Sequence, residues 1–263
     1  MSIAGDATPP GFVRVGVAPR EAIVREREAN DVRAVLTAST LHDWASRVYG
    51  AHLYTGRAPA YGVALPGSGT RVVVRHARHG GLFAPITGDR FAGSGRAPHE
   101  LATSARLVAA RVPTPAFVGY AVYPAGFGLS RIDVLVEEVA GARDLANMVR
   151  DGGMTEPLIA ATAQLLAALA RAGARHEDLN LKNILISRPA LPNGDPGEPK
   201  AYAIDVDRVS FGHPRVRTME ANIARLARSA RKWRRGRELP IGEEELATLA
   251  RRARELAARE QAA

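Results

Sequence analysis

Short hydrophobic runs separated by glycine, proline and charged residues dominate the first half of the chain. Runs of this length that are bounded by turn residues are typical of β-strands. They predict strands at 53–54, 61–65, 71–75, 117–122 and 132–139. Before the fourth of these, a segment at 98–111 is predicted to be a helix, with Pro98 in its first turn and Pro113 beyond its end.

The second half of the chain changes to hydrophobic residues spaced three and four positions apart, the spacing of amphipathic helices. We expect helices at 142–150, 156–172, 220–235 and 243–258. Two short strands are expected on either side of a loop at 189–199 that is rich in proline and glycine. The pattern predicts an α+β protein, with a β-rich half that contains one helix and then a mainly helical half.

The N-terminal segment has a weaker pattern. Residues 1–11 are small and rich in proline, so we expect them to be disordered. Between 20 and 48, Val32, Val35 and Leu36 have helical spacing among charged residues, which predicts a helix. We therefore divide the chain into a flexible N-terminus with a helix at 1–48, a β-rich domain at 49–139 and a helical domain at 140–263.

One segment of the helical half has a specific spacing of polar residues. His176-Glu177-Asp178-Leu179-Asn180-Leu181-Lys182-Asn183 has the H-x-D-L-x-x-x-N spacing of a kinase catalytic loop. Phosphoryl transfer needs a carboxylate that orients the attacking hydroxyl, and we assign this role to Asp178. His176 is expected to hold the loop by hydrogen bonding. The alternative is a polar turn in an ordinary α/β domain, because short motifs also occur by chance.

A second acidic segment, Ile204-Asp205-Val206-Asp207, follows an apolar strand further along the chain. Carboxylate and amide oxygens suit a hard cation such as Mg²⁺. Asn183 and Asp205 are therefore the predicted metal ligands, and the metal would hold the phosphates of ATP. The neighbouring Lys182 and Asp207 are candidates for contact with the phosphate acceptor.

The β-rich half contains a candidate phosphate-binding residue. Arg75 ends the run Val72-Val73-Val74-Arg75, at the place where a kinase carries a phosphate-binding lysine on its third strand. Arginine also binds phosphate, through two parallel hydrogen bonds. Glu100 on the following helix is the predicted partner of Arg75, and the alternative for Glu100 is a solvated helix charge.

Three further places in this half are candidates for ligand contact. Gly56 lies in a turn whose backbone N–H groups are able to approach nucleotide phosphates. Glu138 and Val139 lie at the crossover between the halves, where the backbone of a kinase hydrogen-bonds adenine. Arg78 and His79 precede a pair of glycines and are candidates for binding an anionic acceptor, the alternative being a solvated strand end.

The chain carries a formal net charge of +9, which favours anionic partners. Arginine accounts for 33 of its 36 basic residues, a bias that a GC-rich genome would also produce. Basic residues crowd the segment 215–237 around apolar residues at helical spacing, which predicts an amphipathic helix facing either solvent or an anionic membrane. The absence of cysteine excludes disulfides and thiolate metal sites. No signal peptide or transmembrane span is expected.

Taken together, these segments resemble the lipopolysaccharide kinases, that is, the 3-deoxy-D-manno-octulosonic acid (Kdo) kinases and the related heptose kinases. The resemblance covers roughly residues 54–235 and is carried by the segments at 75–82, 96–100, 112–115, 133–137, 141–145, 176–185, 204–207 and 222–229. In the Kdo-kinase branch, an arginine on the third strand and Asp-x-Asp in place of Asp-Phe-Gly are expected.

The resemblance implies a bilobal protein-kinase-like fold that uses ATP and Mg²⁺. It implies a sugar hydroxyl of the lipid A-linked core saccharide as acceptor, and action at the cytoplasmic face of the inner membrane, against an anionic membrane surface. We interpret the chain as an ATP-dependent kinase of Kdo or heptose. The alternatives are another small-molecule kinase of the same fold and a catalytically inactive, membrane-associated binding module. Nucleic acid is not expected as a partner.

Overall fold

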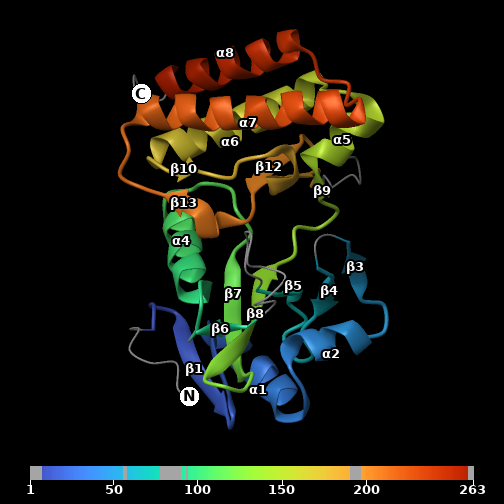
Figure 1. The fold of residues 1–263 in the computed structure, drawn as a ribbon, viewed down its shortest axis with the longest axis vertical. Helices are drawn as coiled ribbons and strands as arrows, with labels where there is room; N and C mark the ends of the chain where they lie inside the picture. The colour runs from blue at the N-terminus through green and yellow to red at the C-terminus, as the bar shows by residue number, and fades with distance from the viewer. Residues whose placement is uncertain (1–7, 56–57, 78–89, 93, 190–196, 260–263) are drawn as a thin grey trace. The chain divides into compact units, whose positions relative to one another are not determined.

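The computed structural model describes residues 8–55, 58–77, 90–92, 94–189 and 197–259 of the chain (Figure 1). The chain divides into two compact units. Unit 1 consists of Met1–Ala102 and Ala116–Glu138, and unit 2 consists of Thr103–Pro115 and Val139–Ala263. The predicted order, a β-rich part followed by a mainly helical part, is confirmed by the order of the elements.

Unit 1 is built on an antiparallel sheet in which the strands follow the order β1-β2-β7-β8-β5-β4-β3, while β6 pairs with β8. The strands are β1 (Phe12–Val17), β2 (Arg20–Arg25), β3 (His52–Tyr54), β4 (Ala60–Ala64), β5 (Arg71–His76), β6 (Phe91–Ala92), β7 (Phe117–Pro124) and β8 (Leu129–Glu137). The helical elements are η1 (Glu26–Glu28), α1 (Ala29–Ala38), α2 (Leu41–Arg47) and the first half of α4 (Ala97–Ala109).

Each face of this sheet is covered by different helices, because alternate residues of a strand point to opposite faces. On one face, Val72 and Val74 of β5 share a hydrophobic cluster with residues of α1 and α2. On the other face, Ile132 and Val134 of β8 share a cluster with Leu101 of α4. The side of β5 opposite to Val72 and Val74 therefore faces α4.

The N-terminal segment differs from the sequence prediction. The helix predicted from Val32, Val35 and Leu36 is present as α1, but residues 20–25 form β2, which pairs with β1 in a hairpin at the edge of the sheet. Strand β2 pairs with β7 on its other side, so Ile23 and Val24 are buried on opposite faces. A short, continuous apolar run of this kind does not distinguish a buried strand from a helix. Residues 8–48 thus belong to unit 1 and not to a separate segment.

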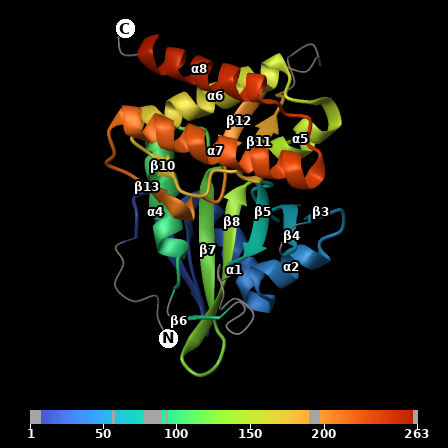
Figure 2. The same ribbon diagram turned by 45° about the horizontal axis from the view of Figure 1, so that its top comes forward.

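Unit 2 contains the second half of α4 and the remaining helices, α5 (Leu145–Gly152), α6 (Glu156–Arg171), α7 (Arg215–Arg237) and α8 (Glu243–Arg259). Figures 1 and 2 both show α6, α7 and α8 side by side, and α6 contacts the other two. Alanine and leucine residues of α6 form the centre of the core of this unit. None of the helices in the described residues is both long enough and apolar enough to span a bilayer.

Short strands complete unit 2. Strands β9 (Arg143–Asp144), β11 (Ile184–Ser187) and β12 (Lys200–Ala203) form one antiparallel sheet, and β10 (Arg175–His176) pairs with β13 (Val209–Ser210). The single turns η2 (Leu181–Asn183) and η3 (Val206–Arg208) lie between them. The helix α6 ends at Gly173, whose φ of 60° favours glycine, and the chain then enters β10. The end of α6, the most buried helix of this unit, therefore positions the segment that carries His176 and Asp178.

Candidate functional site

The candidate site in unit 2 begins at His176, which is 1% exposed. Its backbone N–H donates to Oδ1 of Asn222 at 3.0 Å, and its ring Nε2 lies 3.0 Å from the carbonyl oxygen of Ile204. A carbonyl only accepts, so Nε2 carries the proton. Burial lowers the pKa of His176, although the carbonyl of Ile204 and the nearby Asp205 oppose this. A neutral His176 therefore ties the segment of Asp178 to the end of the strand that leads to Asp205.

Asp178 lies two residues after His176 and is half-buried. Its carboxylate Oδ1 accepts a hydrogen bond from Nη2 of Arg225, and Nε of Arg225 donates to the carbonyl oxygen of Glu177 at 2.9 Å. The carbonyl oxygen of Asp178 accepts from Nδ2 of Asn183 at 2.9 Å. Both the backbone and the carboxylate of Asp178 are thereby held in place, as the positioning of an attacking hydroxyl requires.

Asn180, which the sequence analysis did not single out, shapes the turn between these residues. Its Oδ1 accepts from the backbone N–H groups of Lys182 and Asn183 at 2.9 and 3.2 Å, which caps the turn η2. Its Nδ2 donates to the carbonyl oxygen of Asp178 at 3.1 Å. Asparagine is common in turns, so its presence alone does not indicate a special role. Only its position inside the motif could have pointed to Asn180 from the sequence.

The predicted metal ligands Asn183 and Asp205 are brought together by the hairpin of β11 and β12. Ile184 pairs with Ala203, and the backbone N–H of Ile204 donates to the carbonyl oxygen of Asn183 at 3.0 Å. Asn183 and Asp205 therefore flank the same end of this hairpin. Asp205 adopts a left-handed backbone conformation with φ of 61°, which is uncommon outside glycine and is found at functional sites.

The donor atoms at this end fit a hard divalent cation. Nδ2 of Asn183 donates to the carbonyl oxygen of Asp178, so Oδ1 of Asn183 is the amide atom that remains to bind a cation. Asp205 adds an exposed carboxylate. Over the described part of the chain, no three His, Cys, Asp or Glu side chains gather into a metal-binding group. A cation at this site would thus rely on the amide oxygen, on Asp205 and on phosphate oxygens.

The two candidate substrate-contacting residues lie on either side of this set. Lys182 is exposed, and its Nζ lies 5.5 Å from the centre of the Trp233 ring on α7. Asp207 is half-buried in η3, and its charge acts on the pKa of His176 in the same direction as those of Asp178 and Asp205. Lys182 thus lies against α7, whereas Asp207 belongs with the other carboxylates of the site, those of Asp178 and Asp205.

Helix α7 holds the whole loop through three polar side chains that the sequence analysis gave no site role. Asn222 accepts from His176 and donates from Nδ2 to the carbonyl oxygen of Ala174 at 3.1 Å. Arg225 contacts Asp178, and Oγ of Ser229 accepts from the backbone N–H of Leu181 at 3.3 Å. Residues spaced by three, four and seven positions share one face of a helix. The spacing of these three residues could have indicated their shared face from the sequence, but the many arginines around them obscured the pattern.

In unit 1, the predicted pair of Arg75 and Glu100 is present, with Nη2 of Arg75 donating to Oε1 of Glu100. Arg75 pairs in register with Val134, whose side chain packs on the α4 face of the sheet. The arginine therefore points to α4, where Glu100 is 7% exposed. The alternative of a solvated charge for Glu100 is excluded by this burial.

Glu138 is already engaged within unit 1. Its backbone N–H donates to the carbonyl oxygen of Arg71 at 3.0 Å, and its carboxylate accepts from Nε of Arg71 at 2.5 Å and from the hydroxyl of Tyr54 at 2.7 Å. Burial alone would raise the pKa of Glu138, but these two donors outweigh it and the pKa is lowered. The carbonyl oxygen of Val139, in unit 2, accepts from Ala142 at 3.2 Å.

Three of the residues predicted from the sequence, Gly56, Arg78 and His79, lie outside the described residues. Apart from Glu138 and Val139, the other predicted residues fall into two sets. Unit 2 brings together His176, Asp178, Asn183, Asp205 and Asp207, with Lys182 alongside, and unit 1 joins Arg75 to Glu100.

Comparison with known proteins gives a consistent result. The sequence profile of the family described as "Lipopolysaccharide kinase (Kdo/WaaP) family" matches residues 55–251. The chain is 33% identical over 186 residues to the 3-deoxy-D-manno-octulosonic acid kinase of Xanthomonas oryzae pv. oryzae, covering 69% of this chain and 70% of that one. It is 28% identical over 183 residues to the protein of the same name from Vibrio parahaemolyticus, covering 68% and 72%.

Among solved structures, WaaP in complex with acyl carrier protein is similar, with a TM-score of 0.47 and 18% identity over 89% of this chain and 98% of that one. The Rio2 kinase from Chaetomium thermophilum has a TM-score of 0.48 and 17% identity over 95% of this chain and 83% of that one.

Proposed function

Because the chain belongs to the lipopolysaccharide kinase (Kdo/WaaP) family, we propose that this phosphotransferase transfers the γ-phosphoryl group of ATP to a hydroxyl of Kdo in a lipid A-linked core saccharide. The family membership confirms the resemblance drawn from the sequence. The proposal of Kdo and not heptose is supported by the names of the relatives from Xanthomonas and Vibrio. The observation that carries the proposal is the joint placement of Asp178, Asn183 and Asp205 in unit 2.

In this proposal, Asp178 accepts a hydrogen bond from the acceptor hydroxyl and directs its oxygen towards the γ-phosphorus. The proton of the hydroxyl passes to the Asp178 carboxylate as the new O–P bond forms and the bond to the β-phosphate oxygen breaks. Arg225 and Asn183 keep the carboxylate and its backbone fixed while this happens. Positioning of this kind is the main contribution that a protein makes to phosphoryl transfer.

The phosphates of ATP would be held by oxygen ligands and by one arginine. Oδ1 of Asn183 and the carboxylate of Asp205 would hold Mg²⁺, which when bound neutralises charge on the phosphates. Arg75 would bind phosphate oxygens, with Glu100 fixing the orientation of its guanidinium. His176 does not contact the reactants in this proposal, because it is buried and already bonded to Ile204.

We also propose that the protein works at the cytoplasmic face of the inner membrane, since a lipid-linked acceptor must be reached there. The basic helix α7 supports an electrostatic attraction to anionic lipid. Two of its arginines, Arg231 and Arg234, are paired with Glu243, so the attraction would rely on the remaining exposed cations, among them Arg215 and Arg217. Trp233 packs against the core of unit 2 and is not proposed to insert into lipid.

The proposed activity is tested by incubating the purified protein with γ-labelled ATP, Mg²⁺ and a panel of Kdo-lipid A and heptosylated acceptors, followed by mass spectrometry. We expect a mass gain of one phosphate on the Kdo residue. The Asp178→Asn variant is the matched control and should give no product. Phosphate on heptose alone would retain the family but overturn the choice of sugar, and no transfer to any acceptor would support an inactive binding module.

A further inference from the structure

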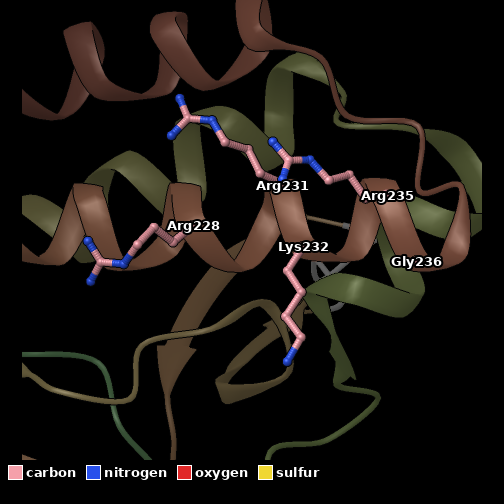
Figure 3. A pocket seen from close by; sticks show the side chains of 5 residues that line it. All are labelled: Arg228, Arg231, Lys232, Arg235 and Gly236. Atoms are coloured by element: carbon pink, nitrogen blue, oxygen red, sulfur yellow. The ribbon is translucent and has the colours of Figure 1, made fainter.

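A concave site on α7 lies apart from the residues assigned above to phosphoryl transfer. It has a volume of about 570 Å³ and is lined by Arg228, Arg231, Lys232, Arg235 and Gly236 (Figure 3). Four of the five lining residues are cationic. A concave, cationic site of this kind suits a discrete anionic group better than it suits an apolar ligand.

The charges that line this site are not equivalent. Arg231 donates from Nη2 to Oε2 of Glu243 at 2.7 Å and from Nε to Oε1 at 3.1 Å. Hydrogen bonds from Arg231 and from Arg234 lower the pKa of Glu243 to about 2, so this carboxylate stays ionised and pairs with both arginines. Within the part of the chain that the structure describes, Arg228, Lys232 and Arg235 have no carboxylate partner. These three residues are the uncompensated cations of the site.

These three cations are also placed by the fold close to the proposed acceptor position. Their spacing of four and three residues puts them on successive turns of α7, and in Figure 3 their side chains spread from the helix, with Lys232 towards one side and Arg235 beside Arg231 on the other. The same helix contacts Asp178 through Arg225 and contacts Leu181 through Ser229. At 1.5 Å per residue, Arg228 lies about 4.5 Å and Arg235 about 15 Å further along the helix axis than Arg225. A molecule whose hydroxyl reaches Asp178 thus has its neighbouring groups within reach of this site.

We infer that Arg228, Lys232 and Arg235 bind carboxylate or phosphate groups of an acidic acceptor saccharide and so orient its hydroxyl towards Asp178. The inference rests on the proposed function, whose acceptor, an octulosonic acid, carries a carboxylate by its chemistry. Guanidinium groups recognise carboxylate and phosphate through two parallel hydrogen bonds, and an ammonium group adds a mobile point charge. A saccharide is preferred to a membrane surface as the occupant, because the same helix holds the loop of Asp178 through Arg225 and Ser229.

The test compares two triple variants, each of which removes three positive charges from unit 2. Arg228→Gln, Lys232→Gln and Arg235→Gln together remove the proposed site. Arg188→Gln, Arg215→Gln and Arg217→Gln together remove three exposed cations elsewhere and serve as the matched control. Circular dichroism and thermal unfolding establish that both variants fold. The single variants Arg228→Gln and Arg235→Gln replace the triple variant if it does not fold.

Two binding measurements separate a saccharide from a lipid surface. De-acylated Kdo-lipid A, which is free of fatty acyl chains, is titrated by calorimetry, and sedimentation is measured with phosphatidylcholine vesicles that contain phosphatidylglycerol. We expect the site variant to lose roughly tenfold or more in affinity for the de-acylated saccharide, since charge-assisted contacts are each worth severalfold in binding. The control variant should retain that affinity and lose only vesicle binding.

Steady-state kinetics complete the test. The site variant should raise KM for the saccharide by a similar factor while KM for ATP stays unchanged. Equal saccharide affinity in the site variant and the wild type, or absence of saccharide binding by the wild type, overturns the inference. If the site variant loses vesicle binding but keeps its affinity for the saccharide, the site binds lipid and the inference is overturned. If the wild type binds the saccharide through this site but transfers no phosphate, the proposed function fails and the binding site stands.

Discussion

Arg225 of α7 donates two hydrogen bonds to the candidate loop, from Nη2 to the carboxylate of Asp178 and from Nε to the carbonyl oxygen of the preceding residue, Glu177. A residue that lies 47 positions after Asp178 in the sequence thus fixes the orientation of the proposed base. The guanidinium also places a positive charge beside this carboxylate. Arg225 is a positioning residue in this account, because it acts through Asp178.

Replacing Arg225 with Gln should lower kcat by roughly 10- to 100-fold, since small displacements of a positioned group have effects of that size. KM for ATP should change little, because Arg225 makes no proposed contact with the nucleotide. Arg225→Lys keeps the charge but not both hydrogen bonds, so it should fall between the wild type and Arg225→Gln. Steady-state kinetics on all three proteins provide the measurement, and a change in KM for ATP alone would contradict the assigned role.

Replacing Asp178 with Asn should leave the protein folded and reduce phosphoryl transfer by roughly 10²- to 10⁴-fold, the usual range for loss of a general base. The asparagine amide has the same shape as the aspartate carboxylate, which is only half-buried, so we do not expect unfolding to cause the loss of activity. Transfer is measured with labelled ATP, and folding is checked by circular dichroism. Turnover close to that of the wild type would show that the base lies elsewhere.

Asn183→Ala and Asp205→Ala should both raise the Mg²⁺ concentration needed for half-maximal rate, because each removes one proposed oxygen ligand. The effect of Asp205→Ala should be the larger, since it removes a charge. Rates are titrated against Mg²⁺ at saturating ATP. Asp207→Asn is the comparison variant, and an equal shift in all three would indicate a general electrostatic effect in place of ligation.

Asn222→Ala should lower the free energy of unfolding by about 2 kcal/mol, because it leaves the buried N–H of His176 and the carbonyl of Ala174 without a partner. Ser229→Ala removes a single, longer hydrogen bond and should cost about 1 kcal/mol or less. Urea unfolding of the two variants beside the wild type gives both values. The order of the two effects is the critical result, and a larger loss for Ser229→Ala would be inconsistent with the role of Asn222.

Unit 1 should lose stability below pH of about 6.5 through His42. Burial lowers the pKa of His42, and the neighbouring His76, whose ring stacks at 3.7 Å, acts in the same direction. The unfolded chain therefore binds a proton at a higher pH than the folded chain, and stability falls as pH drops from 6.5 towards the lower, folded pKa.

The His42→Phe variant keeps a ring in this position but does not titrate. The urea midpoint of the wild type should fall between pH 7.5 and pH 5.5 by more than that of His42→Phe. An identical fall in the two proteins would assign the acid sensitivity to other groups.

The sequence by itself determined the elements that depend on local pattern. Strands β3, β4, β5, β7 and β8 and helices α4 to α8 lie close to the predicted positions, because glycine, proline and a clear change of hydrophobic spacing mark their ends. The motif that carries Asp178 and Asn183, and Asp205 after the next strand, could likewise be recognised from residue type and spacing, while the roles assigned to these residues stay predictions.

Only the tertiary structure decided which distant residues meet. The hairpin of β1 and β2 was not predictable locally, since Ile23 and Val24 read as part of a helix until β7 pairs beside them. Arg225, Asn222 and Ser229 had no predicted contact with the loop, because only the packing of α7 against it brings them there. The pairing of Arg231 with Glu243 likewise left Arg228, Lys232 and Arg235 as the uncompensated cations. Spacing along a chain specifies local geometry, whereas partners far apart in sequence are chosen by packing.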